Sequence, residues 1–247
     1  VSGVEPGATL QLLRDNVVVR TLLDVTPAGP GNAVAIQDPG VPGDGTFTYT
    51  ARQFDAAGNA SPVVGNLRVT IDTAAPAASA DPDLQAASDT GPSNTDNVTS
   101  RTRPVFDVAT SEATATVQLL RKLSTAPAGA FAVVAERTGP GSIQDPGIVP
   151  DGIYDYATRQ VDVAGNIGPR SGSLRVQIDT TLPARPARPD LDAGSDTGIS
   201  SSDDITRITL FQFAVFQVSG VEATATVFLV RDCDGASPVN SRIGPGA

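Results

Sequence analysis

The sequence predicts an all-β protein made of tandem β-sandwich modules, and three observations carry this prediction. First, the 247-residue chain repeats itself at a fixed interval. Second, segments such as 46–54 and 153–161 alternate between polar and apolar residues, which is typical of half-buried strands. Third, clusters of Gly, Pro, Asp and Asn separate these segments, and no segment combines a helical period with helix start and stop signals.

The repeat interval is 107 residues: Ile-Gln-Asp-Pro-Gly occurs at 36–40 and at 143–147, and Asp-x-Ala-Gly-Asn at 55–59 and at 162–166. This interval is too long for a helical or leucine-rich solenoid repeat, but it is the size of one immunoglobulin-like sandwich, about 100 residues. We therefore expect tandem immunoglobulin-like β-sandwich modules in a parent chain that continues on both sides. The expected boundaries are 1–75 for the C-terminal part of one module, 76–182 for a complete module, and 183–247 for the N-terminal part of a third.

We expect the complete module to be a single sandwich of seven strands. Aromatic residues make up only 4% of the chain, so the core must consist mainly of Val, Leu, Ile and Ala. Strands are predicted at 77–85, 104–109, 115–122, 131–137, 153–162 and 173–179. The predicted core residues are Phe106, Val117, Leu119, Tyr156 and Val176. In the third module the repeat register holds as far as Phe213, the match of Phe106, and then slips by three residues before Val218.

Composition excludes several classes of function. The chain has no His, so it lacks the residue needed for a Ser-His-Asp triad or a His-ligated zinc site. Its single Cys, Cys233, excludes a disulfide framework within the chain, and we expect a free thiol there. A net charge of −10 argues against nucleic acid, and no stretch approaches the roughly 18 apolar residues of a membrane helix. Acidic pairs recur in every module, where a duplicated active site is implausible, so no enzyme is expected.

Four segments in a fixed order carry a resemblance to a known family. They are 72–76 (Asp-Thr-Ala-Ala-Pro), 88–99 (beginning Ser-Asp-Thr-Gly), 112–117 (Glu-Ala-Thr-Ala-Thr-Val) and 162–166. In this order the chain resembles the bacterial Ig-like repeats that form the stalks of giant RTX-type and biofilm-associated surface adhesins. The resemblance implies secreted modules strung head to tail at the bacterial cell surface and stiffened by calcium. The segment 207–218 departs from the pattern.

Acidic residues gather where the sandwich topology places the module junctions. Ca²⁺ takes about six to eight oxygen ligands, mostly carboxylates and carbonyls. The last strand of a module ends at the junction, where it meets two loops of the following module, while the loop after the first strand lies at the lower end of its own module. We therefore expect calcium ligands among Asp72, Glu112, Asp162 and Asn166 at one junction, and among Asp89, Asp96, Asp179 and Glu222 at the next.

Turn formation is the competing explanation for the same residues. Asp-x-x-Gly-Asn is a good turn sequence without any metal, because Asp and Asn cap turns and Gly takes positive φ. The run 232–235 (Asp-Cys-Asp-Gly) resembles the start of an EF-hand loop but lacks the spaced Glu that should follow.

Two functional classes remain open from the sequence. The first is a non-enzymatic structural repeat of an extracellular adhesin stalk or filament, in which the partners are neighbouring copies of the module and chains also associate laterally. The second is a set of accessory modules in a secreted enzyme or carbohydrate-binding protein. A module that itself binds a receptor or sugar is a third option. Repetition favours the first class, since length is what repetition supplies.

Overall fold

The computed structural model describes residues 1–28, 30–40, 43–207, 213–223, 225–231 and 240–243. Within these residues the regular elements are β-strands and one 3-10 helix, η1 (Ala128–Ala130), so the all-β prediction is confirmed. The chain forms two compact units, Val1–Thr180 and Thr181–Ala247. Cys233, the 232–235 run and residues 208–212 of the divergent segment lie outside the described residues.

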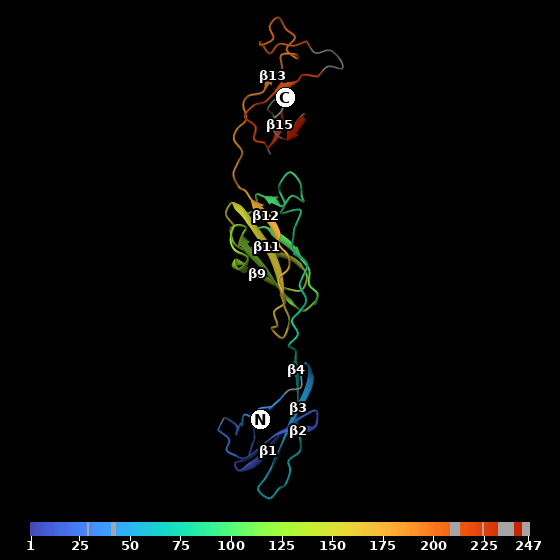
Figure 1. Cartoon of the computed structure of the whole chain (residues 1–247), viewed down its shortest axis with the longest axis vertical. Coiled ribbons are helices and arrows are strands. Elements are labelled where there is room, and N and C mark those ends of the chain that lie inside the picture. Colours follow the sequence, from blue (N-terminus) through green and yellow to red (C-terminus); the bar gives the residue numbers. More distant parts are fainter. Residues whose placement is uncertain (29, 41–42, 208–212, 224, 232–239, 244–247) are drawn as a thin grey trace. The chain divides into compact units, whose positions relative to one another are not determined.

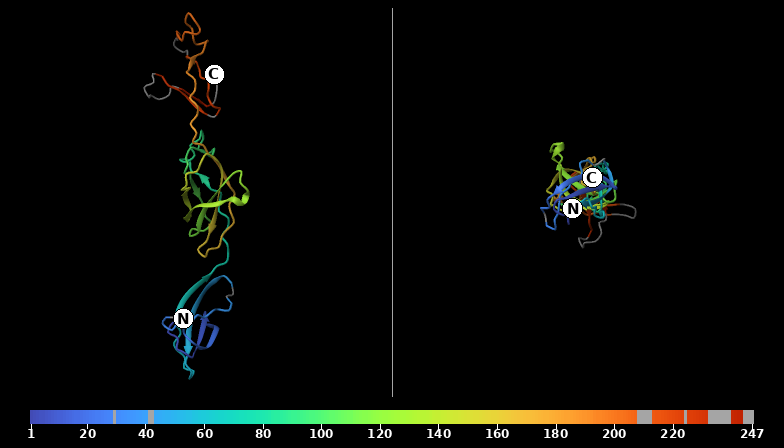
Figure 2. Two further views of the ribbon diagram at one scale, coloured as in Figure 1. Left: turned by 90° about the vertical axis from the view of Figure 1, so that its left-hand side faces the viewer. Right: turned by 90° about the horizontal axis from the view of Figure 1, so that it is seen from below.

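The middle module, residues 76–182, contains two sheets. The larger sheet has five strands in the order β6 (Val98–Thr99), β12 (Leu174–Ile178), β11 (Gly152–Val161), β8 (Thr116–Leu123), β9 (Ala132–Thr138). The smaller sheet has three strands in the order β10 (Gly141–Gln144), β7 (Val105–Val108), β5 (Asp83–Leu84). These strands, coloured from teal (β5) through green and yellow to orange (β12), are seen from two directions in Figures 1 and 2.

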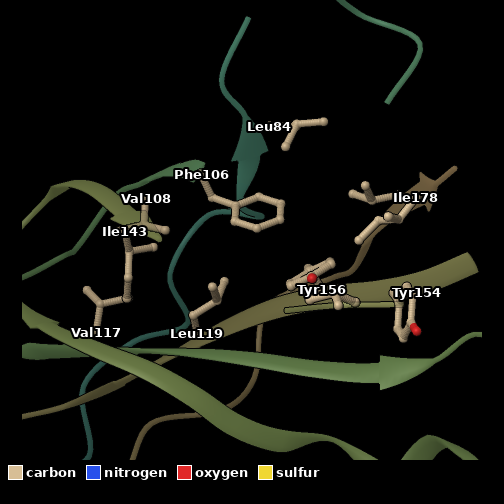
Figure 3. Close-up of a cluster of buried hydrophobic side chains, with 11 residues drawn as sticks. Leu84, Phe106, Val108, Val117, Leu119, Ile143, Tyr154, Tyr156 and Ile178 are labelled. Atoms are coloured by element: carbon tan, nitrogen blue, oxygen red, sulfur yellow. The ribbon is translucent and has the colours of Figure 1, made fainter. Parts of the chain in front are cut away.

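One apolar core lies between the two sheets (Figure 3). The rings of Phe106, from β7, and Tyr156, from β11, pack with their centroids 4.4 Å apart, so that one contact joins the sheets. All five predicted core residues are confirmed, because each is 0% exposed: Phe106, Val117, Leu119, Tyr156 and Val176. Burial of this cluster is the main stabilising term of the module.

The middle module has eight strands rather than the seven predicted. The strands β6 and β10 were missed because they are only two and four residues long. The strand predicted over 77–85 is wrong for most of its length, since only Asp83 and Leu84 join a ladder. Prolines flank the remainder, and its carbonyls are bonded by side chains of β11 instead: Gln160 Nε2 donates to the carbonyl of Ala77 at 2.8 Å.

The first module, residues 1–75, contributes one four-stranded antiparallel sheet. Its strands follow the order β2 (Val17–Val25), β1 (Ala8–Arg14), β3 (Gly45–Phe54), β4 (Val64–Ile71). The hairpin between β1 and β2 turns through Asp15 and Asn16, whose φ angles of 49° and 68° are those of a two-residue hairpin turn with positive φ at both positions. A small core of Val4, Ala8, Leu10 and Val25 lies against this sheet.

In the third module, residues 183–247, the described strands are β13 (Asp190–Leu191), β14 (Phe216–Gln217), β15 (Thr226–Leu229) and β16 (Asn240–Ile243). Leu191 pairs with Phe216, just as Leu84 pairs with Phe106 in the middle module. Phe216 therefore takes the place of Phe106, and the predicted match of Phe213 is wrong, since Phe213 is 87% exposed. The three-residue insertion therefore lies N-terminal to Phe216, and Phe213 is not the equivalent of Phe106. Backbone pairing, rather than sequence spacing, sets the register of this strand.

Candidate functional site

Asp162 is the first residue of a turn that follows β11. Its Oδ1 accepts hydrogen bonds from the backbone N–H groups of Ala164 and Asn166, both at 2.8 Å. Its Oδ2 accepts a third, also 2.8 Å long, from Asn166 Nδ2. The bond from the Asn166 side chain is the main reason why the pKa of Asp162 lies below its usual value. Both oxygens of this carboxylate are thus bonded within the turn itself.

The first module contains the same turn. Asp55 Oδ1 accepts from the N–H groups of Ala57 and Asn59, at 2.9 and 2.8 Å, and Oδ2 accepts from Asn59 Nδ2 at 2.8 Å. The Asn59 side chain likewise lowers the pKa of Asp55. Turn formation, the competing explanation from the sequence, therefore accounts for the Asp, the Gly and the Asn of this motif in both modules.

A single hydrogen bond brings the linker residue Asp72 to one of its predicted partners. Asn166 Nδ2 donates to the backbone carbonyl of Asp72 at 3.0 Å. The carboxylate of Asp72 accepts a hydrogen bond from the N–H of Ala74, within the linker, at 3.0 Å. Glu112 is exposed in the loop before β8, and its backbone carbonyl accepts from the N–H of Ala115 at 3.2 Å. Of the residues predicted for this junction, Asn166 is therefore the one with a hydrogen bond to the linker residue Asp72.

The acids predicted for the second junction belong to two different units. Asp179, at the end of β12, is exposed, and its N–H donates to the carbonyl of Thr99 at 2.9 Å. Glu222 Oε1 accepts from the N–H of Ala184 at 2.8 Å within the third module. Each of the two acids is thus placed within its own unit, and their shared ligand role stays a prediction.

Asp89 and Asp96 lie in the loop between β5 and β6. Because β6 pairs in parallel with β12, this loop sits beside the end of β12 and the start of the Asp179 linker. Asp89 is only 5% exposed, and its Oδ1 is buried without a hydrogen-bond partner. Both oxygens of Asp162 therefore accept hydrogen bonds, whereas one oxygen of Asp89 accepts none.

The Asp of the repeated Ile-Gln-Asp-Pro-Gly segment is a functional residue that the sequence did not predict. Asp145 is 1% exposed, and its Oδ2 accepts hydrogen bonds from Arg121 Nη1 and, at 3.0 Å, from the hydroxyl of Tyr156. The first module repeats this arrangement with Arg14 and Tyr49, which donate to Asp38 Oδ2 at 2.8 and 2.7 Å. The repetition of Asp at a fixed offset was the signal. Its partners on neighbouring strands appear only in three dimensions.

Among the described residues, no group of three or more acidic or Cys side chains is close enough to hold a metal ion by itself. The described part of the chain also contains no helix long and apolar enough to cross a membrane.

The two sheets and their shared core define an immunoglobulin-like β-sandwich. Residues 76–180 match the family model described as Bacterial Ig-like domain. Over 173 residues, 66% of the chain, the sequence is 31% identical to Exoglucanase B of Cellulomonas fimi, and the chain spans 14% of that protein's length. The crystal structure of chicken CNTN1 FN1–FN3 domains aligns with 70% of this chain and 56% of its own, with a TM-score of 0.47 and 12% identity.

Proposed function

We propose that this chain is a non-catalytic structural repeat of an extracellular bacterial surface protein. Modules joined in series hold an adhesive part away from the cell or build a surface filament. The neighbouring copies of the module are its main partners, and lateral association of chains belongs to the same proposal. The match to the Bacterial Ig-like domain model supports the extracellular setting, since such domains are common in surface proteins.

The observation that carries the proposal is that successive modules repeat their internal bonding, not merely their sequence. The Arg–Asp–Tyr arrangement around Asp145 recurs around Asp38, and the Asp162 turn recurs at Asp55. These repeated groups stabilise the fold of each module. A chain that repeats its scaffold supplies length, and in such arrays each repeat contacts only its neighbours.

Calcium at the junctions is part of the proposed function. The linker carbonyl of Asp72 is already held by Asn166, and the carboxylates of Asp72 and Asp162 belong to the same junction. Like charges that meet at a joint repel one another, and a divalent cation removes that repulsion. Extracellular modules bind calcium with Kd of about 10⁻⁴–10⁻³ M, so millimolar calcium outside the cell would fill such sites substantially.

Small-angle scattering on the 247-residue chain tests the junction, with calcium and with EDTA. The distribution of maximum dimension is expected to be narrow with calcium and broad with EDTA, while circular dichroism stays β in both. Asp72→Ala combined with Asp162→Ala should remove the part of the response that comes from this junction and leave that of the Asp179 junction, whereas the matched control Asp55→Ala, in the turn of the first module, should keep the whole response. Outright unfolding in EDTA, or no change at all, would show that the junction account is wrong.

A second candidate function is that of accessory modules in a secreted enzyme that acts on polysaccharide. The specific observation in its favour is the 31% identity to part of Exoglucanase B. Sedimentation of the chain with insoluble cellulose separates the two functions. A surface spacer stays in the supernatant, whereas co-sedimentation that soluble cello-oligosaccharide reverses would favour the accessory module.

A further inference from the structure

Where the chain leaves the last strand of the middle module, a threonine is bound to an acid that precedes a central strand. Thr180 follows β12, and its N–H group and its hydroxyl both donate to Asp151 Oδ1, at 3.1 and 2.7 Å. Asp151 comes immediately before β11, the strand that pairs with β12. The two bonds therefore extend the β11–β12 ladder beyond its last pair, Gly152 and Ile178.

The first module contains the same two bonds. Thr73 follows β4, and its N–H group and hydroxyl donate to Asp44 Oδ1 at 3.0 and 2.8 Å. Asp44 comes immediately before β3, the partner of β4. We call the two pairs, Asp151–Thr180 and Asp44–Thr73, the Asp–Thr clamps. Because they recur at the repeat interval of 107 residues, the clamp belongs to the module and not to one particular loop.

The glycine that follows each acid fixes the position of the carboxylate. Gly152 has a φ of +155° and Gly45 a φ of +153°, a conformation that residues with a side chain rarely adopt. A Cβ at Gly152 would lie 3.4 Å from the ring of Tyr154, and one at Gly45 would lie 3.3 Å from the ring of Phe47. Both modules therefore use an Asp-Gly turn, packed under an aromatic ring, to place the acid beside the threonine.

The end of β12 is held on its other side as well. In the sheet, β12 lies between β11 and β6, and β6 pairs with it in parallel. The N–H of Gln177 donates to the carbonyl of Asn97 at 2.9 Å. The N–H of Asp179 donates to the carbonyl of Thr99, also at 2.9 Å. The chain thus leaves the module bonded to β6 through the backbone and to β11 through the clamp.

The chain enters and leaves the middle module at opposite ends of β11. At one end Asp151 holds Thr180, and near the other end Gln160 Nε2 donates to the carbonyl of Ala77 at 2.8 Å. Since β11 has ten residues and a strand rises about 3.3 Å per residue, these ends are roughly 30 Å apart. Tension applied through the two linkers therefore acts along the strands. Antiparallel ladder bonds lie perpendicular to the strands, so such tension loads them together.

We propose that the Asp–Thr clamp divides tension between two strands. Pull that arrives through the linker at Thr180 passes directly to β12 and, through Asp151, also to β11. Asp44 and Thr73 have the same role in the first module. The inference rests on the proposed function, since a surface stalk under load is the source of the tension. The clamp residues are not among those predicted as calcium ligands.

The test compares unfolding under force with unfolding in urea, on the 247-residue chain held by its two ends. Thr180→Val removes the hydroxyl bond but keeps the shape of the side chain. At constant force its middle module should unfold about three- to tenfold faster than that of the parent, because a bond to a charged group is lost where the load enters. In urea, without force, the unfolding rate should change less. Thr180→Ser keeps the hydroxyl and should behave as the parent does.

Ser142→Ala is the matched control. Ser142 Oγ donates to Asp107 Oδ1 at 3.0 Å in the smaller sheet, so this variant also loses a bond from a hydroxyl to a carboxylate, but away from the linkers. Its unfolding rate should change by the same factor with force and without it.

Two results would overturn the proposal. If Thr180→Val responds to force no more than Ser142→Ala does, the clamp stabilises the module but carries no load. If calcium abolishes the difference between Thr180→Val and the parent, a bound ion carries the load instead. The force measurement is made in EDTA and in CaCl₂, so failure of the scattering test for calcium at the junctions would leave its result unchanged.

Discussion

The Asp162 turn and the Asp89 loop look alike as sequences, but their carboxylates are in opposite conditions. Both segments combine Asp, Gly, Asn and small residues, and both gave the same calcium prediction. In the structure Asp162 receives three hydrogen bonds from its own turn, whereas Asp89 receives one and buries its other oxygen without a donor. A cluster of acids is therefore no guide to a metal until the donors around each oxygen are known.

The largest expected effect concerns a third buried carboxylate, which the chain compensates with its own cation. Arg121→Met leaves Asp145, only 2% exposed at its side chain, without its charge partner. Removal of one partner of a buried ion pair typically costs about 3–5 kcal/mol. The free energy of unfolding, measured by urea denaturation, should therefore fall by roughly 3 kcal/mol.

Arg175→Met is the matched control for that experiment. Arg175 is 70% exposed at its side chain in its pair with Asp155, and an exposed pair contributes only about 0–1 kcal/mol. An equal loss of unfolding free energy in the two variants would contradict the claim that the buried Arg121–Asp145 pair stabilises the module more than the exposed Arg175–Asp155 pair does.

The next effect separates turn formation from metal binding. Asp162→Ala removes three hydrogen bonds to a charged acceptor, and we expect a loss of about 2 kcal/mol, the same in calcium and in EDTA. Exchange of the Asn166 amide should accelerate in parallel. A loss that appears only in calcium would mean that a bound ion, and not the hydrogen bonds of the turn, holds the turn together.

A smaller effect is expected from calcium on the Asp89 loop. With Kd near 10⁻⁴ M, 1 mM calcium should stabilise the parent module by about 1.4 kcal/mol per ion, and the Asp89→Asn variant should gain nothing at this loop. Thermal unfolding in CaCl₂ and in EDTA measures the difference. MgCl₂ at the same concentration is the control, since Mg²⁺ sheds its water reluctantly and prefers octahedral sites.

The smallest effect is the acid response of Asp155, which is compensated by neighbours on its own sheet. Burial would raise its pKa, but hydrogen bonds from Lys122, Ser124 and Arg175 outweigh burial and lower the pKa to about 2. The stability contributed by these bonds is complete above the unfolded pKa of 3.8 and is lost as the pH falls toward 2. Down to pH 3.5 the loss should stay under about 1 kcal/mol, and Lys122→Met should reduce it.

Strand and core prediction succeeded where side chains alternate over many residues. The alternation around Tyr156 and Val117 identified long strands and their buried faces, since the side-chain period of a strand is two and burial selects one face. It was least reliable for the shortest strands, which show little alternation: β6 and β10 were missed and β5 was predicted too long, although the four-residue β7 was predicted. It also failed at Phe216, where an insertion moved the sequence match away from the paired position.

The sequence by itself determined the repeat, the all-β class and the residues of the core, because these depend on local periodicity and on the transfer of apolar side chains out of water. Only the tertiary structure decided which acids are satisfied. The donors that meet Asp162 come from its own turn, the cation that meets Asp145 comes from a neighbouring strand, and the oxygen of Asp89 meets none. The state of a carboxylate depends on atoms brought close by folding, and distances between segments far apart in the chain are not encoded in any local pattern.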